Sequence, residues 1–344
     1  MREGLALMLQ IFGGLAMFLV GMEGMSAALQ RTAGVRMKQL LQAAAGGPLR
    51  AVLTGALVTA VLQSSSAVTV LVLGFVSAGL LELPQAIAVI FGANIGTTMT
   101  AQLLAFRLED WVGLILFAGF FLQFAARGRV RTAGSGVFCF GLLFEGIAVM
   151  GGALQPLTDH PAVQLWLQQV KDRPVLGILL GCGMTLTVQS SSATIAVLQK
   201  VASQPGPDGV HSLLGLAGAL PVLLGDNIGT TITAVLASIG QSRDAKRVAA
   251  AHCCFNLSGA VVFCIALPWF EQAVRLVSPQ GAELDIIARQ IANAHTLFNT
   301  VCTLLWLPLL PVMVRLVTVL VPEKKSCKSD QMQENGFVQS VGKV

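Results

Sequence analysis

The chain carries one pair of polar motifs twice, and each copy is embedded in strongly apolar sequence. Gln-Ser-Ser-Ser (QSSS) occurs at residues 63–66 and again at 189–192. Each copy is followed by a block that reads Gly-x-Asn-Ile-Gly-Thr-Thr-x-Thr-Ala, at 92–101 and at 225–234. Polar groups in apolar surroundings cost free energy unless they have a partner or a function. Polar interruptions repeated in corresponding apolar segments are typical of the central binding site of a transporter.

The composition indicates an integral membrane protein. Of the 344 residues, 54% are hydrophobic and 11% are charged, whereas a soluble domain carries about 25% charged residues. No basic cluster is interleaved with aromatic residues, so the net charge of +5 does not indicate nucleic-acid binding. The seven cysteines lack the spacing of a metal site. Membrane spans are predicted at 5–29, 84–106, 111–126, 134–154, 212–239, 248–270 and 291–320.

The apolar segments beside the QSSS motifs are too short to span a membrane. Residues 49–62, 67–80 and 175–188 form stretches of 14 residues each. As helices they reach about 21 Å, and a hydrocarbon core is roughly 30 Å thick. These lengths favour re-entrant hairpins with QSSS at the tip, although one long tilted helix over 49–81 is an alternative.

The basic residues of the predicted loops support the hairpin interpretation. With two hairpins, the basic groups near 31–50, 127–131, 243–247 and 324–328 all fall on one side of the membrane. That is the positive-inside pattern, and it predicts an external N-terminus and a cytoplasmic C-terminus. The same trace gives the two repeats inverted topology, which permits alternating access to a central site.

The predicted fold class is therefore an all-α integral membrane protein of inverted-topology repeats. Each repeat holds a re-entrant QSSS hairpin and a helix that its Gly-x-Asn-Ile-Gly-Thr-Thr block breaks midway. The predicted divisions are an N-terminal transmembrane helix and cytoplasmic loop at 1–47, repeat one at 48–154, an external connector at 155–173, repeat two at 174–320 and a cytoplasmic tail at 321–344.

The QSSS motifs have the groups that bind an oxyanion. A helix N-terminus at the break adds N–H donors and partial positive charge, which favour an anion without a buried lysine or arginine. Hydroxyl and amide oxygens also accept hydrogen bonds, so a small cation can bind beside the anion. Close helix packing is the structural alternative. The candidate substrate residues are Gln63, Ser64, Ser65, Ser66, Gln189, Ser190, Ser191 and Ser192.

The second block predicts ligands for Na⁺. A helix broken at its glycines frees carbonyl groups, which join asparagine and threonine oxygens as hard ligands. Asp226 breaks the symmetry, because Ala93 holds the same place in repeat one. A membrane carboxylate is a functional candidate that binds a cation or takes up a proton, and a helix cap is the alternative. The candidate sodium ligands are Asn94, Thr97, Thr98, Asp226, Asn227, Thr230 and Thr231.

A His-x-x-Phe-Asn pattern also occurs twice, at 252–256 and 295–299. Its histidine and asparagine face the same way on a helix. With too few ligands for a metal, the pattern favours hydrogen bonds between helices. The supporting residues are His252, Asn256, His295 and Asn299. Glu23, near a basic loop, is expected to snorkel or to pair, and Glu145 has no assigned role.

Together these motifs resemble those of the type II sodium/phosphate cotransporter family, over residues 5–320. The resemblance implies Na⁺-coupled movement of inorganic phosphate, no cofactor other than the coupling ion, and a mobile transport unit that works against a scaffold. It implies that the QSSS residues contact phosphate or Na⁺ and that the asparagines and threonines support them. Asp226 departs from the small residue usual in the family. No regulatory domain of the kind that some bacterial members append is expected in the short tail, and a bacterial inner membrane is the expected location.

Three other functions compete with Na⁺/phosphate symport. The same fold can export phosphate or carry another oxyanion, with protons bound at Asp226. An anion channel requires a continuous pore, whereas two hairpins that meet predict an occluded site. An enzyme is disfavoured, because the chain has no Gly-x-Ser-x-Gly, P-loop or His-Glu-x-x-His motif. The expected partners are phosphate, Na⁺ and the lipid bilayer, and direction, coupling ion and oligomeric state stay open.

Overall fold

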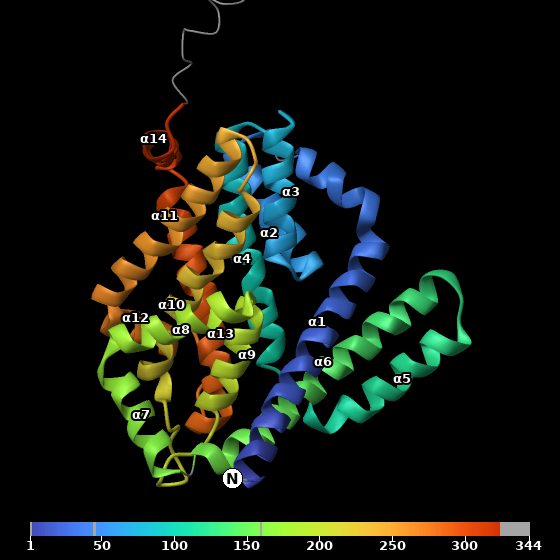
Figure 1. Ribbon diagram of the computed structural model, residues 1–344, viewed down its shortest axis with the longest axis vertical. Helices are drawn as coiled ribbons and strands as arrows, with labels where there is room; N and C mark the ends of the chain where they lie inside the picture. Colours follow the sequence, from blue (N-terminus) through green and yellow to red (C-terminus); the bar gives the residue numbers. More distant parts are fainter. Residues whose placement is uncertain (1, 44–45, 159, 324–344) are drawn as a thin grey trace, which may run out of the picture.

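A computed structural model describes residues 2–43, 46–158 and 160–323, and these residues form fourteen α-helices and one 3₁₀ helix (Figure 1). The helices are α1 (Arg2–Ala43), α2 (Pro48–Leu62), α3 (Ser65–Ser77), α4 (Leu83–Leu104), η2 (Glu109–Trp111), α5 (Val112–Ala125), α6 (Gly128–Thr158), α7 (Pro161–Asp172), α8 (Pro174–Val188), α9 (Ser191–Ala202), α10 (Gly215–Ala237), α11 (Arg243–Ile265), α12 (Leu267–Leu276), α13 (Glu283–Trp306) and α14 (Leu310–Leu320).

Helix length and apolarity confirm an all-α, multi-pass membrane protein. Five of the described helices are long and apolar enough to cross a membrane, and the number rises to six if α13 and α14 count as one bent span. Three of the four helices that flank the QSSS motifs, α2, α3 and α8, are shorter apolar helices of 10–17 residues, as the sequence predicts.

Several predicted boundaries differ from the structure. Helix α1 continues to Ala43, where a loop is predicted from about residue 30. The predicted span 248–270 divides into α11 and α12, and Pro268 lies in the first turn of α12. The predicted span 291–320 bends by 88° between α13 and α14. Pro308 lies in that break, and proline has no N–H for the helical hydrogen bond. The predicted tail lies outside the described residues from 324 onward.

The prediction of a broken helix at each Gly-x-Asn-Ile-Gly-Thr-Thr block is wrong. Helices α4 and α10 run without interruption through both blocks. Their glycines serve close packing instead: a Cβ on Gly92 would collide with the carbonyl oxygen of Val52 on α2, and one on Gly225 with that of Ile178 on α8. Glycine destabilises a helix by about 1 kcal/mol relative to alanine. Small residues are nevertheless typical of contacts between transmembrane helices, because they let the two backbones approach closely.

The same packing therefore occurs twice. Helices α2 and α4 meet through glycines and backbone carbonyls, and so do α8 and α10. Each pair continues into a helix that begins with the QSSS serines, α3 in the first copy and α9 in the second. Ser77, the last residue of α3, bonds to Ser242 before α11, whereas Gln199 near the end of α9 bonds to Ala288 of α13.

Helix α1 and the α5–α6 hairpin form a separate flank of the molecule, visible beside the other helices in Figure 1. Glycines again permit close packing here, since a Cβ on Gly14 of α1 would collide with α6 at Gly146. A distinct apolar cluster joins this flank to α4 and α9. Its buried members are Phe18, Met22, Met25, Leu104, Val112, Leu143, Phe144, Met150, Ala193 and Ala196.

Candidate functional site

Each QSSS motif forms a tight break between two helices. Gln63 ends α2 with φ 53°, and Ser64 caps α3 by accepting a hydrogen bond from the N–H of Ala67. The second copy repeats this geometry, with φ 56° at Gln189 and Ser190 as the cap. These glutamines are the only non-glycine residues with positive φ in the described part of the chain. Left-handed backbone is unfavourable for such residues and is concentrated at functional sites.

The two tips, far apart in sequence, line one cavity of about 520 Å³. All eight QSSS residues contribute to its wall. Helices α3 and α9 both begin there, and the first N–H groups of a helix have no acceptor within it. The only charged residue on the wall, among the residues that the structure describes, is Glu23. The groups of this wall that can attract an anion are therefore helix N-termini, hydroxyl groups and side-chain amide N–H groups.

The two tips differ in how their glutamines are held. Gln63 is buried, and its Oε1 accepts a hydrogen bond of 2.9 Å from the hydroxyl of Thr100 on α4. The amide nitrogen of Gln63 donates to the carbonyl oxygen of Ala60. Gln189 is exposed on the cavity wall. The first glutamine is therefore engaged with the protein, while the second faces the space that a ligand would occupy.

Helix α1 supplies a wall of the cavity that sequence reasoning missed. Glu23, Ser26 and Gln30 line it together with the QSSS residues. Glu23 was expected to snorkel or to pair, and the structure places it exposed on the cavity wall. The Ser26 hydroxyl donates to the carbonyl oxygen of Leu62 at 2.6 Å and so ties α1 to the first tip. The signal was a polar stripe at helical spacing on an otherwise apolar helix.

The structure does not bring the candidate sodium ligands together at the cavity. Thr97 lines the cavity, and the other six members of that set do not. The hydroxyl of Thr97 donates to the carbonyl oxygen of Ala93, one turn back on its own helix, and Thr230 donates to that of Asp226 in the same way. Because α4 and α10 are continuous, no carbonyl is freed at the glycines. The set does not form one ligand shell around the cavity.

Asp226 lies in the middle of α10 and is fully buried, so it is not a helix cap. The hydroxyl of Thr185 donates to Asp226 Oδ1 at 2.6 Å, and Thr185 Oγ1 lies 2.9 Å from the hydroxyl of Thr194 in α9. Asp226 Oδ2 has no hydrogen-bond partner among the described residues. The carboxylate is thereby connected, through two threonines, to the helix that carries the second QSSS tip.

The first repeat lacks this carboxylate. Ala93 stands in place of Asp226, and Thr59, which precedes Gln63 by the same interval as Thr185 precedes Gln189, has a buried hydroxyl without a partner in the described chain. The pairing of threonine with aspartate is therefore confined to the second repeat.

One residue of each His-x-x-Phe-Asn pattern, His252 in the first and Asn299 in the second, forms the kind of contact between helices that the sequence predicts, whereas Asn256 Nδ2 donates to the carbonyl oxygen of His252 within its own helix. His252 Nε2 on α11 lies 3.1 Å from Asn94 Oδ1 on α4. Asn299 Nδ2 on α13 donates to Asn227 Oδ1 on α10 at 3.3 Å. All four side chains are buried. Asn94 and Asn227 therefore connect helices, and neither lines the cavity.

Comparison with known proteins gives matches along most of the chain. A model of the Na⁺/Pi-cotransporter family matches twice, over residues 17–152 and over residues 146–275. The chain is 33% identical to YqeW, an uncharacterized protein of Bacillus subtilis, over 89% of this chain and 96% of that protein. No solved structure matches significantly.

Two further relatives have names that state a function. One is the "Putative inorganic phosphate export protein YjbB" of Escherichia coli, 25% identical over 92% of this chain; the chain spans only 56% of that protein's length. The other is sodium-dependent phosphate transport protein 2B of Homo sapiens, 34% identical over 48% of this chain and 24% of that protein.

Proposed function

The chain belongs to the Na⁺/Pi-cotransporter family, and from this premise we propose that it is a secondary active transporter that carries inorganic phosphate together with Na⁺. Phosphate binds between the two QSSS tips, and alternating access exposes that site to each side of the membrane in turn. The single observation that carries the proposal is that both tips line one cavity.

The chemistry of the cavity suits an anion accompanied by a cation. Phosphate oxygens accept hydrogen bonds from serine hydroxyls and from the N–H groups at the starts of α3 and α9. Among the described lining residues no lysine or arginine balances the anion, and Glu23 adds negative charge. A cation that binds with phosphate reduces this repulsion. This charge arrangement supports coupling to Na⁺.

Asp226 supports a second cation or proton site. An ionised carboxylate that is fully buried is costly without a counter-charge, and Oδ2 of Asp226 has no protein partner among the described residues. A sodium ion or a proton at Oδ2 removes that cost. We place this site beside the second tip, next to Thr185 and Thr194.

The repeated architecture supports alternating access. The family model matches twice, and the α2–α4 and α8–α10 pairs pack through the same glycine contacts. We propose that repeats at 48–154 and 174–320 have inverted topology, with each QSSS segment as a re-entrant hairpin. The inner membrane of a bacterium, with an external N-terminus and a cytoplasmic C-terminus, agrees with the distribution of basic residues.

Phosphate export is the second candidate function. The relative named for export matches 92% of this chain, and a proton at Asp226 offers a different coupling ion. The same binding site serves either direction, because the imposed gradients set the direction of a secondary transporter.

Transport of labelled phosphate into proteoliposomes tests the proposal, with Na⁺ and pH gradients imposed separately. We expect a Na⁺ gradient to drive uptake. We also expect Ser65→Ala or Ser191→Ala to weaken the apparent affinity for phosphate about 10- to 150-fold, because a lost hydrogen bond to a charged ligand costs about 1.5–3 kcal/mol. Ser238→Ala, at a serine that does not line the cavity, is the control. Uptake that ignores Na⁺ but follows the pH gradient would favour proton coupling, and wild-type transport in both serine variants would contradict the proposed site.

A further inference from the structure

Glu23 of α1 lies on a stretch of helix that is tied to both QSSS tips. Ser26, three residues and about 4.5 Å farther along α1, donates to the carbonyl oxygen of Leu62, the residue before the first tip. Met22 belongs to the same buried apolar cluster as Ala193, which lies in the first turn of α9 after the second tip. Glu23 itself is exposed and lines the cavity that the tips share. Its carboxylate therefore faces the space in which the proposed substrate binds.

The carboxylate of Glu23 differs chemically from every other polar group on this wall. In the described part of the chain it has no hydrogen-bond or ion-pair partner, and it is the only charged side chain that lines the cavity. The remaining polar side chains there carry hydroxyl or amide groups, which both donate and accept hydrogen bonds. An ionised carboxylate only accepts. Glu23 is therefore the wall group that responds to whether a ligand oxygen carries a proton.

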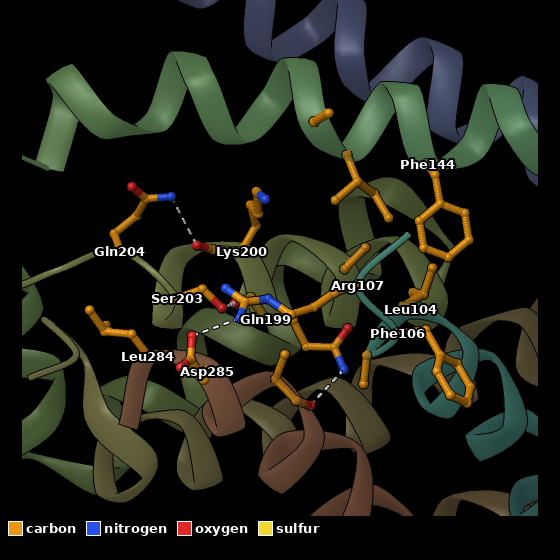
Figure 2. Close-up of a pocket in the computed structure, with 15 residues that line it drawn as sticks. Leu104, Phe106, Arg107, Phe144, Gln199, Lys200, Ser203, Gln204, Leu284 and Asp285 are labelled. Atoms are coloured by element: carbon orange, nitrogen blue, oxygen red, sulfur yellow. Dashed lines mark hydrogen bonds and ion pairs between the residues drawn. The ribbon is translucent and has the colours of Figure 1, made fainter. Parts of the chain in front are cut away.

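The basic residues of a neighbouring cavity do not change this arrangement. A second cavity, of about 420 Å³, lies at the ends of α4 and α9 and is lined by Arg107 and Lys200 (Figure 2). Arg107 is directed toward Asp285, 2.7 Å away, and Lys200 also has a partner. Neither basic residue lines the cavity between the tips. An anion at the tips therefore meets Glu23 without a lysine or arginine on the described wall to offset it.

A carboxylate in this position distinguishes between oxyanions of similar shape. Near neutral pH inorganic phosphate keeps at least one P–OH group and arsenate at least one As–OH group, whereas sulfate carries no proton. Serine hydroxyls and the N–H groups at helix N-termini can donate to the bare oxygens of all three anions. A carboxylate accepts a strong, charge-assisted hydrogen bond from an O–H group, but it repels a bare anionic oxygen.

We propose that Glu23 is a specificity-determining residue of the cavity between the QSSS tips: its carboxylate accepts a hydrogen bond from the P–OH group of phosphate and so excludes oxyanions that carry no proton. The hydroxyl and N–H groups of the tips bind the remaining oxygens, and the coupling cation offsets the charge that is left. The inference rests on the proposed function, and it accounts for the presence of a carboxylate in an anion site.

Competition against the uptake of labelled phosphate into proteoliposomes, at saturating Na⁺, is the first test. The competitors are arsenate, sulfate and monofluorophosphate, in which fluorine replaces the hydroxyl of hydrogen phosphate and no proton is left near neutral pH. We expect arsenate to inhibit the wild type well and the two unprotonated anions to inhibit it weakly. In Glu23→Gln the inhibition constants of sulfate and monofluorophosphate, relative to the KM for phosphate, should fall about 10- to 150-fold, the effect of one hydrogen bond with a charged group.

Glu145→Gln is the matched control. Glu145 is also a glutamate within an apolar helix, α6, but it does not line the cavity, so this variant should keep the wild-type selectivity. The inference would be overturned if Glu23→Gln kept that selectivity too, or if both glutamate variants lost it equally. Inhibition of the wild type by sulfate and monofluorophosphate as strong as that by arsenate would also overturn it.

Displacement of labelled phosphate from the purified protein at a fixed Na⁺ concentration is the second test, because it measures recognition without transport. We expect the same selectivity in the wild type and the same loss in Glu23→Gln. Glu23→Asp keeps a group that only accepts, so it should exclude sulfate more strongly than Glu23→Gln does. Equal displacement by sulfate in these two variants would show that the carboxylate does not set the selectivity.

These measurements separate the role of Glu23 from its premise. If the wild type takes up no labelled phosphate under any imposed gradient, the proposed function fails. If the wild type carries phosphate and Glu23→Gln rejects sulfate as the wild type does, the proposed function stands and the role of Glu23 is refuted.

Discussion

Replacing Asp226 with alanine makes the second repeat resemble the first, where Ala93 holds the same place. The carboxylate is fully buried, its Oδ1 accepts from Thr185 at 2.6 Å, and its Oδ2 has no partner in the described chain. If Oδ2 binds the coupling cation, the substitution removes a charged ligand and leaves the serines of the proposed phosphate site in place. Asp226→Asn keeps the volume but removes the charge.

The expected size of the effect follows from these contacts. Loss of one interaction with a charged group costs about 1.5–3 kcal/mol, or about 10- to 150-fold in cation affinity. Folding should be affected much less, because Thr185 keeps its neighbour Thr194, and the cost of burying an ionised carboxylate disappears. We therefore expect both variants to express and to retain thermal stability.

Transport current measured against Na⁺ concentration at two pH values checks this expectation. The half-saturating Na⁺ concentration should rise about 10- to 150-fold in Asp226→Ala and in Asp226→Asn alike. If Asp226 carries a proton instead, both variants should lose pH dependence and keep the wild-type Na⁺ response. Curves that coincide for all three proteins at both pH values would refute a coupling role for Asp226.

Three further predictions test neighbouring features. Glu23→Gln should make phosphate transport less dependent on Na⁺, because the cavity loses its described negative charge; an unchanged Na⁺ activation curve would contradict this. Gly92→Ala should lower the melting temperature sharply by forcing α2 away from α4, whereas Gly183→Ala, with open space around it, should have little effect; equal melting temperatures would refute the packing argument. Thr185→Val should weaken cation coupling, whereas Thr59→Val, which removes an unpartnered buried hydroxyl, should preserve transport and stability; similar transport in both variants would argue against the Asp226 pairing.

The sequence by itself determined the class of protein and the place of the QSSS tips. The apolar composition indicates that the chain lies in a membrane, and the apolar segments around Gln63 and Gln189 are too short to span that membrane as single helices. The helix break is local chemistry, since a serine such as Ser64 caps the helix that follows it. These properties depend on residues close together in the chain, so a single sequence is enough to read them.

The glycine blocks show where local sequence is ambiguous. Glycine can interrupt a helix, or it can let another backbone approach a continuous one. At Gly92 and Gly225 the second role applies, because α2 and α8 pass directly against these positions. Nothing within the blocks distinguishes the two roles. The choice depends on where another helix lies.

Only the tertiary structure decided which polar groups share a space. It placed Glu23 of α1 on the cavity wall, excluded most of the candidate sodium ligands from it, and paired Asp226 with Thr185. Each of these groups lies on a helix whose own conformation permits many neighbours. Which neighbours it has depends on how helices distant in the chain pack to bury their apolar faces and glycine contacts, and that packing is a property of the whole fold.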